Sequence, residues 1–142
     1  MQITFQRLDP ELPEPTRAHP DDAGWDLVAA ADVILEPGER AAIPTGLAVA
    51  IPAGHGGLVL PRSGHARRFG LGVVNGPGLI DPGYRGEISV LLINHGDQRV
   101  ELSRGERIAQ LVIVAVPEVS WVEQNSLDTT SRGAGGFGST GR

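Results

Sequence analysis

The sequence predicts an all-β domain with a closed or two-sheet antiparallel architecture, such as a jelly roll or a barrel. Its 20 glycines and 11 prolines are spread along the 142 residues and separate short apolar runs, a pattern typical of strands joined by turns. Crossover helices are not expected between these runs, so the strands would pair antiparallel. A chain of this length is expected to form one domain around one core.

The first strand is expected at Ile3 to Leu8, where apolar residues begin with a period of two, and a proline-rich loop from Pro10 to Pro20 follows. Only Ser63–Phe69 is expected to form a helical turn, with Ser63 as its N-cap. The other apolar runs predict strands at Trp25–Ala31, Val33–Leu35, Ala41–Thr45, Leu47–Pro52, Gly57–Pro61, Leu71–Asn75, Glu87–Asn94, Arg99–Leu102, Arg107–Val116 and Val119–Val122. The segments Leu35–Arg40 and Leu102–Arg107 resemble each other, which indicates one kind of turn used twice.

The segment Asn75–Glu87 contains two Pro-Gly pairs. In the second pair, Pro82 fixes one φ and Gly83 can supply a positive φ, which predicts a type II turn with Asp81 and Tyr84 at its corners. Proline also favours an extended conformation for the preceding Asp81. A carboxylate held beside an aromatic ring suggests a functional site, although turn formation alone would also explain these residues.

Composition narrows the possible chemistry. All 12 basic residues are arginine and cysteine is absent, which excludes a lysine Schiff base, a cysteine nucleophile and disulfides. The formal net charge of −5 argues against nucleic acid or an anionic membrane as a partner. Met1–Pro15 shows no secretory pattern, so we expect a cytoplasmic protein without nucleic-acid or membrane partners. Arginine side chains still suit a small ligand with phosphate oxygens.

The composition changes from Gln124 onward to serine, threonine, glycine and isolated charges. We therefore expect a β domain at residues 1–123 and a flexible C-terminal arm at residues 124–142. The glycine N–H groups of the arm, with Arg132, could wrap an anion as a lid. A disordered tail is the simpler alternative.

Four segments complete a pattern with Asn75–Glu87: Ala23–Leu27, Pro61–Gly64, Arg104–Leu111 and the terminal arm. In this order and spacing they resemble the five motifs of the homotrimeric dUTPases, the deoxyuridine triphosphate nucleotidohydrolases. The resemblance implies a distorted, β-clip-like jelly roll that forms a homotrimer, with active sites at subunit boundaries and each arm closing over a neighbour's site. It also implies Mg²⁺-dependent hydrolysis of dUTP to dUMP and pyrophosphate, which limits uracil incorporation into DNA and supplies dUMP for dTMP synthesis.

The same resemblance assigns roles to individual residues. Asp81 would be the general base that activates water for attack on the α-phosphorus, and Asp26 would hold Mg²⁺ through its water shell. Tyr84 would pack on the deoxyribose and exclude a 2′-hydroxyl. The phosphates would contact Arg62, Ser63, Gly64, Gln110, Arg132, Ser139 and Thr140. The uracil would contact Asn75, Gly78 and Ile80 and stack on Phe137, with Gly138 completing the binding residues of the arm.

Two other functions compete with this one. A dCTP deaminase, or a bifunctional dCTP deaminase and dUTPase, attacks the base and characteristically uses a glutamate near it; the turn at Asp81 and the complete arm favour the hydrolase. A non-catalytic protein that senses dUTP is a competitor of another class, but it would not need Asp26, Asp81 and Gln110 together. His65 stands where the family usually has an aliphatic residue. It could add pH dependence near the phosphates, although a histidine on the helix surface is the simpler expectation.

Overall fold

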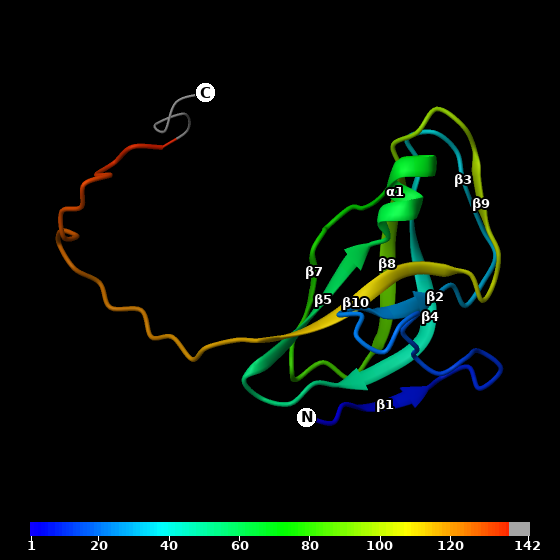
Figure 1. The fold of residues 1–142 in the computed structure, drawn as a ribbon, viewed down its shortest axis with the longest axis horizontal. Coiled ribbons are helices and arrows are strands. Elements are labelled where there is room, and N and C mark those ends of the chain that lie inside the picture. The colour runs from blue at the N-terminus through cyan, green and yellow to red at the C-terminus, as the bar shows by residue number, and fades with distance from the viewer. Residues whose placement is uncertain (137–142) are drawn as a thin grey trace.

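The computed structural model describes residues 1–136 and consists mainly of two four-stranded antiparallel sheets. The first sheet has the order β1 (Thr4–Arg7), β4 (Arg40–Ala50), β8 (Glu87–Asn94) and β6 (Leu71–Val73), and the second has β2 (Trp25–Val28), β10 (Arg107–Ala115), β5 (His55–Pro61) and β7 (Gly78–Ile80). A two-stranded sheet joins β3 (Val33–Leu35) to β9 (Val100–Leu102), and the helix α1 (Ser63–Phe69) follows β5 (Figure 1). The predicted all-β jelly-roll class is confirmed.

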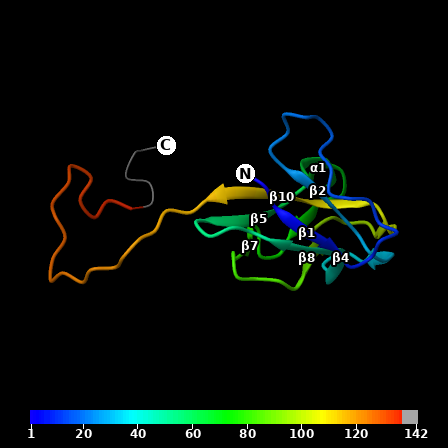
Figure 2. The same ribbon diagram turned by 90° about the horizontal axis from the view of Figure 1, so that it is seen from below.

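The hydrophobic core lies between the two four-stranded sheets. Figure 2 shows β2 and β10 on one side of β4 and β8. Strand β8 alternates inward and outward side chains, with Ile88, Val90 and Leu92 buried, as expected for a strand with one face on a core. The largest apolar side chains in this core that are almost fully buried are Leu27, Leu35, Ile43, Leu92, Leu102 and Ile108. Each contributes about 1.5–3 kcal/mol relative to an exposed position.

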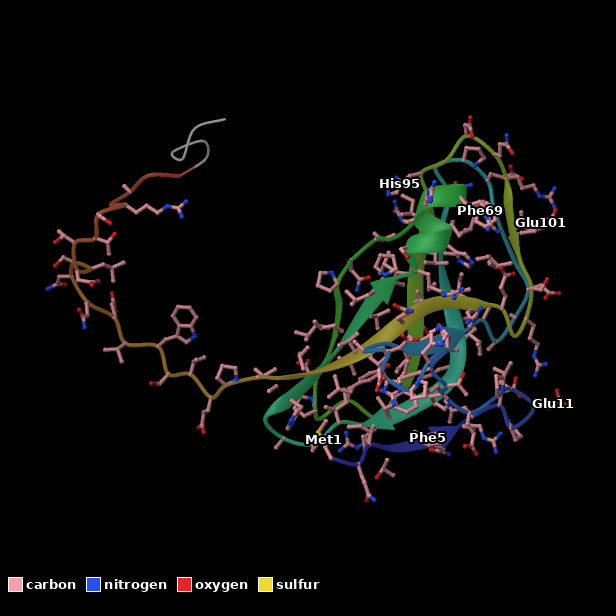
Figure 3. All side chains as sticks on the ribbon, in the orientation of Figure 1. Met1, Phe5, Glu11, Phe69, His95 and Glu101 are labelled. Carbon is pink, nitrogen blue, oxygen red and sulfur yellow. The ribbon has the colours of Figure 1, made fainter. Side chains whose placement is uncertain are left out.

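Asn94 is a polar side chain at the end of this core and is completely buried. Its Nδ2 donates to the carbonyl oxygens of Leu35 (2.9 Å) and Gln98 (2.8 Å), and its Oδ1 accepts from the Gly96 N–H (2.9 Å). Its hydrogen bonds tie β8 to β3 and to the loop before β9. Nearby, Phe69 and His95 lie at the α1 end of the molecule (Figure 3), where the His95 N–H donates to the Gly70 carbonyl at 3.0 Å.

The two similar turns have the same construction, as predicted. Gly38 and Gly105 adopt positive φ values of 79° and 84°, which favour glycine. In each turn the last glutamate accepts a hydrogen bond from the first backbone N–H: Glu39 Oε2 from Glu36 at 2.9 Å, and Glu106 Oε2 from Ser103 at 3.1 Å. The turns follow the paired strands β3 and β9, so they lead the chain from the small sheet into the two large ones.

Beyond shifts of one to three residues at strand ends, the strand prediction was wrong in three places. The runs Ala41–Thr45 and Leu47–Pro52 form the single strand β4, because the register shift between Pro44 and Ala48 is a bulge and not an end. Gly78–Ile80 forms the additional strand β7, which pairs with β5. Val119–Val122 forms no strand: Figure 1 shows the chain leaving the body after β10, where no neighbouring edge is available to pair with it.

The predicted helix α1 is present, but its predicted cap was wrong. Ser63 is the first helical residue, Arg62 occupies the N-cap position, and no side chain there accepts a cap hydrogen bond. The helix ends at Gly70, whose φ of 71° is left-handed and whose N–H donates to Ala66, an ending typical of glycine. No helix among residues 1–136 is both long and apolar enough to cross a bilayer.

We predict that Asn94→Ala lowers the free energy of unfolding by about 2–4 kcal/mol, since the substitution leaves buried backbone groups without partners. Urea unfolding followed by circular dichroism, at one fixed protein concentration, measures this change. Gln98→Ala is the matched control, because the Gln98 side chain is exposed and only its backbone carbonyl contacts Asn94. An Asn94→Ala loss equal to that of the control would contradict a structural role for this side chain.

Candidate active site

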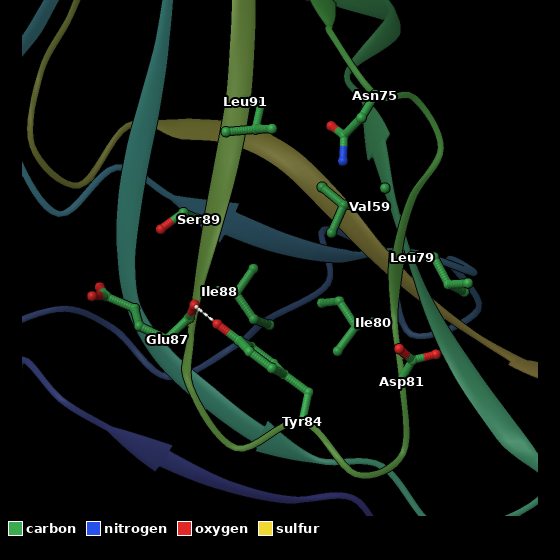
Figure 4. A pocket seen from close by; sticks show the side chains of 11 residues that line it. Val59, Asn75, Leu79, Ile80, Asp81, Tyr84, Glu87, Ile88, Ser89 and Leu91 are labelled. Atoms are coloured by element: carbon green, nitrogen blue, oxygen red, sulfur yellow. Dashed lines mark hydrogen bonds between the residues drawn. The ribbon is translucent and has the colours of Figure 1, made fainter.

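A cavity of about 260 Å³ lies between β7 and the start of β8 (Figure 4). Five residues predicted to bind substrate or activate water line it together: Asn75, Gly78, Ile80, Asp81 and Tyr84. The other lining residues, none of them predicted to contact substrate, are Val59, Leu79, Glu87, Ile88, Ser89 and Leu91. Apolar walls with a few converging polar groups are typical of small-molecule sites.

The turn that presents Asp81 closes with a hydrogen bond from the Tyr84 N–H to the Asp81 carbonyl at 3.1 Å. The prediction of a type II turn was wrong, because Gly83 does not adopt the positive φ that this turn requires. Arg85 instead braces the turn, with Nη1 donating to the carbonyls of Pro82 (2.6 Å) and Tyr84 (2.7 Å). The Asp81 side chain is exposed, so water reaches this carboxylate.

The ring of Tyr84 is held by two neighbours that its sequence position alone did not reveal. Its hydroxyl donates to the Glu87 carbonyl at 2.9 Å. A Cβ atom added to Gly86 would lie 2.5 Å from the hydroxyl oxygen and 2.7 Å from Cζ, well inside van der Waals contact. Gly86 is therefore the residue that makes room for this ring.

The amide of Asn75 lies close to the backbone of β7. A Cβ atom on Gly78 would lie 3.2 Å from Asn75 Nδ2 and 3.3 Å from Val59 Cβ. Gly78 is buried in this position, between the side chains of Asn75 and Val59. A side chain here would push the amide out of the cavity, so the glycine sets how deeply Asn75 can reach.

The second group of predicted residues gathers where β2, β5 and β10 lie side by side. The Asp26 carboxylate is buried between two arginines, with Oδ1 3.6 Å from Arg62 Nε and Oδ2 3.3 Å from Arg107 Nη1. Gln110 is opposite Asp26 in the β10–β2 ladder. Ser63 and Gly64 are exposed at the start of α1. Arg107 is the member that the sequence analysis missed.

Asp26 is the residue predicted to hold Mg²⁺ through its water shell. Its Oδ1 atom is buried and accepts no hydrogen bond. Residues 1–136 contain no group of three or more histidine, aspartate and glutamate side chains that could form a metal cage. Mg²⁺ often keeps most of its water ligands and needs only one or two carboxylates, so this donor set fits a water-mediated contact.

The two groups lie at opposite edges of one sheet. Asp26 is on the edge strand β2, and Asp81 directly follows the edge strand β7, with β10 and β5 between them. The register places Asp26 and Gln110 level with Leu60 of β5, whereas Ile80 is level with Gly57. Strand spacing and rise put the backbone positions of Asp26 and Asp81 about 14 Å apart across the sheet and about 13 Å apart along it. One chain therefore does not bring them to one small ligand.

His65 is not the helix-surface residue expected from the sequence, since its side chain is only 13% exposed. The ring packs edge-on against Phe69, and Nε2 lies 3.7 Å from Glu106 Oε1. Burial, followed by the charge of Arg62, lowers the pKa of His65 below its usual value, and the opposing effect of Glu106 is smaller.

The structure places Arg132 on the arm, away from both groups. It is exposed, and its Nε donates to the Gly135 carbonyl at 3.0 Å. The residues from 116 to 136 are exposed and form no helix or strand. The other predicted arm residues, Phe137, Gly138, Ser139 and Thr140, lie outside the described residues.

Known proteins resemble this chain over nearly its whole length. The family model dUTPase matches residues 11–141. A deoxyuridine 5′-triphosphate nucleotidohydrolase of Nocardia farcinica is 59% identical over 140 residues, covering 98% of this chain and 85% of the relative. The protein of the same name from Thermobifida fusca is 56% identical over 142 residues, covering 99% and 79%.

Two solved structures add to these similarities. The Staphylococcus bacteriophage 80alpha dUTPase with dUPNHPP is 31% identical, with a TM-score of 0.92 and 99% coverage of both chains. A mutant dUTPase from the S. aureus phage phi11, described with a structural Mg(II) ion, is 30% identical, with a TM-score of 0.78; the match covers 88% of this chain and 99% of the phage chain.

We predict that His65 makes the protein less stable in weak acid. Because folding lowers the pKa of His65, the unfolded chain binds the proton first as the pH falls through about 6.5, and stability is lost from there down to the folded-state pKa. His65→Gln should flatten this part of the pH–stability curve measured by urea unfolding. His19→Gln, on an exposed loop, is the matched control. A His65→Gln curve parallel to wild type between pH 7 and 5 would refute the prediction.

Proposed function

The chain belongs to the dUTPase family, and from that premise we propose that it hydrolyses dUTP to dUMP and pyrophosphate in a Mg²⁺-dependent reaction. The observation that carries this proposal is the cavity at β7, where Asn75, Gly78, Asp81 and Tyr84 meet. A cavity of about 260 Å³ suits a nucleoside and not a whole nucleoside triphosphate. The phosphates would then extend out of it, past the exposed Asp81.

Asp81 acts as the general base in this proposal. Its carboxylate takes a proton from a water molecule, which attacks the α-phosphorus in line as pyrophosphate leaves. The Pro82 ring and the hydrogen bonds from Arg85 hold the turn in one conformation. The Asp81 carboxylate therefore loses little conformational freedom when it reacts. Phosphoryl transfer depends mainly on such positioning and on charge neutralisation.

The cavity reads the base and the sugar. The Asn75 amide and the backbone groups of Gly78 and Ile80 pair with the uracil edge, so cytosine would leave buried polar groups unpaired and be rejected. Tyr84 packs on the deoxyribose and leaves no room for a 2′-hydroxyl. The hydroxyl bond to Glu87 supports this role, because it fixes one side of the ring.

The group at β2, β5 and β10 supplies the phosphate contacts. Arg62, Ser63, Gly64 and Gln110 would bind the phosphate oxygens, and Asp26 would hold Mg²⁺ through its water shell. The bound ion would neutralise charge on the triphosphate. The arm, from residue 124 onward, adds Arg132 and the glycine-rich end as a lid over the phosphates, with Phe137 on the uracil.

A homotrimer brings the two groups together. Because Asp26 and Asp81 lie at opposite edges of the sheet in one chain, each active site combines the Asp81 cavity of one subunit with the Asp26 group of another. The arm then closes a neighbour's site. In the cell, we place this activity in the cytoplasm, where removal of dUTP limits uracil in DNA and supplies dUMP.

The alternative functions have less support. No relative named above is a deaminase. Glu87, the glutamate that lines the cavity, directs its carboxylate to the Gly46 N–H at 2.7 Å and not to the space for the base. A sensing protein without catalysis would have no need for a water-accessible Asp81.

Asp81→Asn should lower dUTP turnover by about 10²- to 10⁴-fold and leave dUTP binding largely intact, because the amide keeps the shape but cannot take a proton. Anion-exchange chromatography of dUMP and pyrophosphate gives the turnover, and calorimetry gives the affinity. Wild-type protein incubated with dCTP, dTTP and UTP is the specificity control. Near-normal turnover by the variant would remove Asp81 from its role, and ammonia release from dCTP would move the protein to the deaminase class.

Two inactive variants should restore activity when they share trimers. Asp81→Asn and Arg62→Gln, unfolded and refolded together at equal amounts, should regain about a quarter of wild-type turnover, because a quarter of the sites combine two unaltered halves from different subunits. Each variant refolded alone is the control. Activity no greater than the mean of the two controls would show that each site is built within one chain.

A further inference from the structure

We propose that Glu87 is a positioning residue that sets discrimination between deoxyribose and ribose by fixing Tyr84. This inference rests on the proposed function, in which Tyr84 excludes a 2′-hydroxyl. It concerns the residue that holds the ring and not the ring itself.

Glu87 is connected at both of its ends. Its Oε1 accepts a hydrogen bond from the Gly46 N–H at 2.7 Å, and its backbone carbonyl accepts one from the Tyr84 hydroxyl at 2.9 Å. The side chain therefore anchors the first residue of β8 to β4, while the main chain of the same residue holds the phenol. Movement of Glu87 would move the acceptor on which the Tyr84 ring depends.

The anchor on β4 is a bulge with little freedom. Pro44 pairs with Ser89 and Ala48 with Glu87, so three residues of β4 face the single residue Ile88 between these pairs. Thr45 Oγ1 donates to the Ile88 carbonyl at 2.7 Å. Such a bulge leaves backbone groups outside the regular ladder, and the Gly46 N–H is one of them.

Gly46 is itself fixed from the other side. It is buried with a φ of 65°, and its carbonyl accepts from the Leu8 N–H at 2.7 Å. A Cβ atom here would lie 2.8 Å from Leu12 Cδ1 and 3.0 Å from Asp9 Cβ. The N-terminal segment thus packs against the bulge, and the Gly46 N–H has one fixed direction, toward Glu87.

The role of Glu87 depends on the reach of its side chain and not on its charge. In Figure 4 its carboxylate points away from Asp81 and toward β4, so the charge is not directed at the reacting groups. Glutamine has the same length and an oxygen that can accept the same hydrogen bond. Aspartate keeps the charge but is shorter by one methylene group, about 1.5 Å, and cannot span the distance to Gly46.

Discrimination between dUTP and UTP is sensitive to small movements of the Tyr84 ring. UTP exceeds dUTP by one oxygen atom, and rejecting a single added group in a pocket is worth only about 10- to 200-fold. A small displacement of the Tyr84 ring is enough to admit that atom. Binding of the common uracil and phosphates changes less.

The test is the ratio of kcat/KM for dUTP to kcat/KM for UTP, measured on the homotrimer with Mg²⁺. Glu87→Asp should reduce this ratio by about tenfold, mainly through a gain on UTP, while Glu87→Gln should keep it close to wild type. Both substrates are measured on one sample, so a partly unfolded preparation does not alter the ratio. Glu101→Asp, an exposed substitution of the same kind on β9, is the matched control.

Two results would overturn the proposal. An unchanged ratio in Glu87→Asp would show that the length of the side chain does not control the ring, and a loss in Glu87→Gln as large as in Glu87→Asp would show that charge matters. If wild-type protein turned over no dUTP, the proposed function would fail and this inference with it. Normal dUTP turnover with an unchanged ratio in Glu87→Asp would remove only the role of Glu87.

Discussion

The separation of Asp26 from Asp81 by two intervening strands is the constraint on which the proposed site depends. Strands β10 and β5 pair over seven consecutive residues, from Ala109 with Pro61 to Ala115 with His55, and a ladder of this length does not bend to bring its edges together. The inner face of the same sheet belongs to the core. In the proposed homotrimer, a ligand that needs both carboxylates would lie between copies of the chain, so subunit association would be part of the chemistry and would not merely stabilise the fold.

Asp26 shows how this arrangement accommodates a buried charge. A carboxylate that is only 7% exposed would be costly alone, and Arg62 and Arg107 offset that cost. Their contacts of 3.6 Å and 3.3 Å are longer than the 2.7–2.9 Å typical of a charge-assisted hydrogen bond. The arginine donors are therefore incompletely used, and Arg62, whose side chain is 22% exposed, keeps donors for the phosphate oxygens of the proposed reaction. The buried Oδ1 atom likewise retains acceptor capacity for metal-bound water.

The sequence predicted the parts of the fold that local patterns determine. The apolar run in Glu87–Asn94 predicted strand β8, and the resemblance of the two turn segments predicted their shared construction. Local patterns did not predict the features that depend on contacts with another part of the chain. Pro82-Gly83 is compatible with more than one turn type, and Arg85 braces the one observed. The apolar Val119 and Trp121 have the pattern of a strand, but a strand needs an edge to pair with, and this part of the chain lies beyond its own sheets. Arg107 and Glu87 were not predicted as members of the site, because the contacts of their side chains with Asp26 and with the Gly46 N–H come from residues far away in the sequence.

The prediction of two strands in place of β4 was wrong because it, too, depended on contacts that the local sequence does not show. A glycine after Thr45 indicates an interruption, and the sequence alone does not distinguish the end of a strand from a bulge. In a regular ladder the Gly46 N–H would pair with a backbone carbonyl, and Glu87 would have no buried donor to reach. The bulge releases that N–H and the Thr45 hydroxyl, and both bind the start of β8. An irregularity outside the cavity therefore determines where β8 begins, and through it the position of the Tyr84 ring that borders the substrate space.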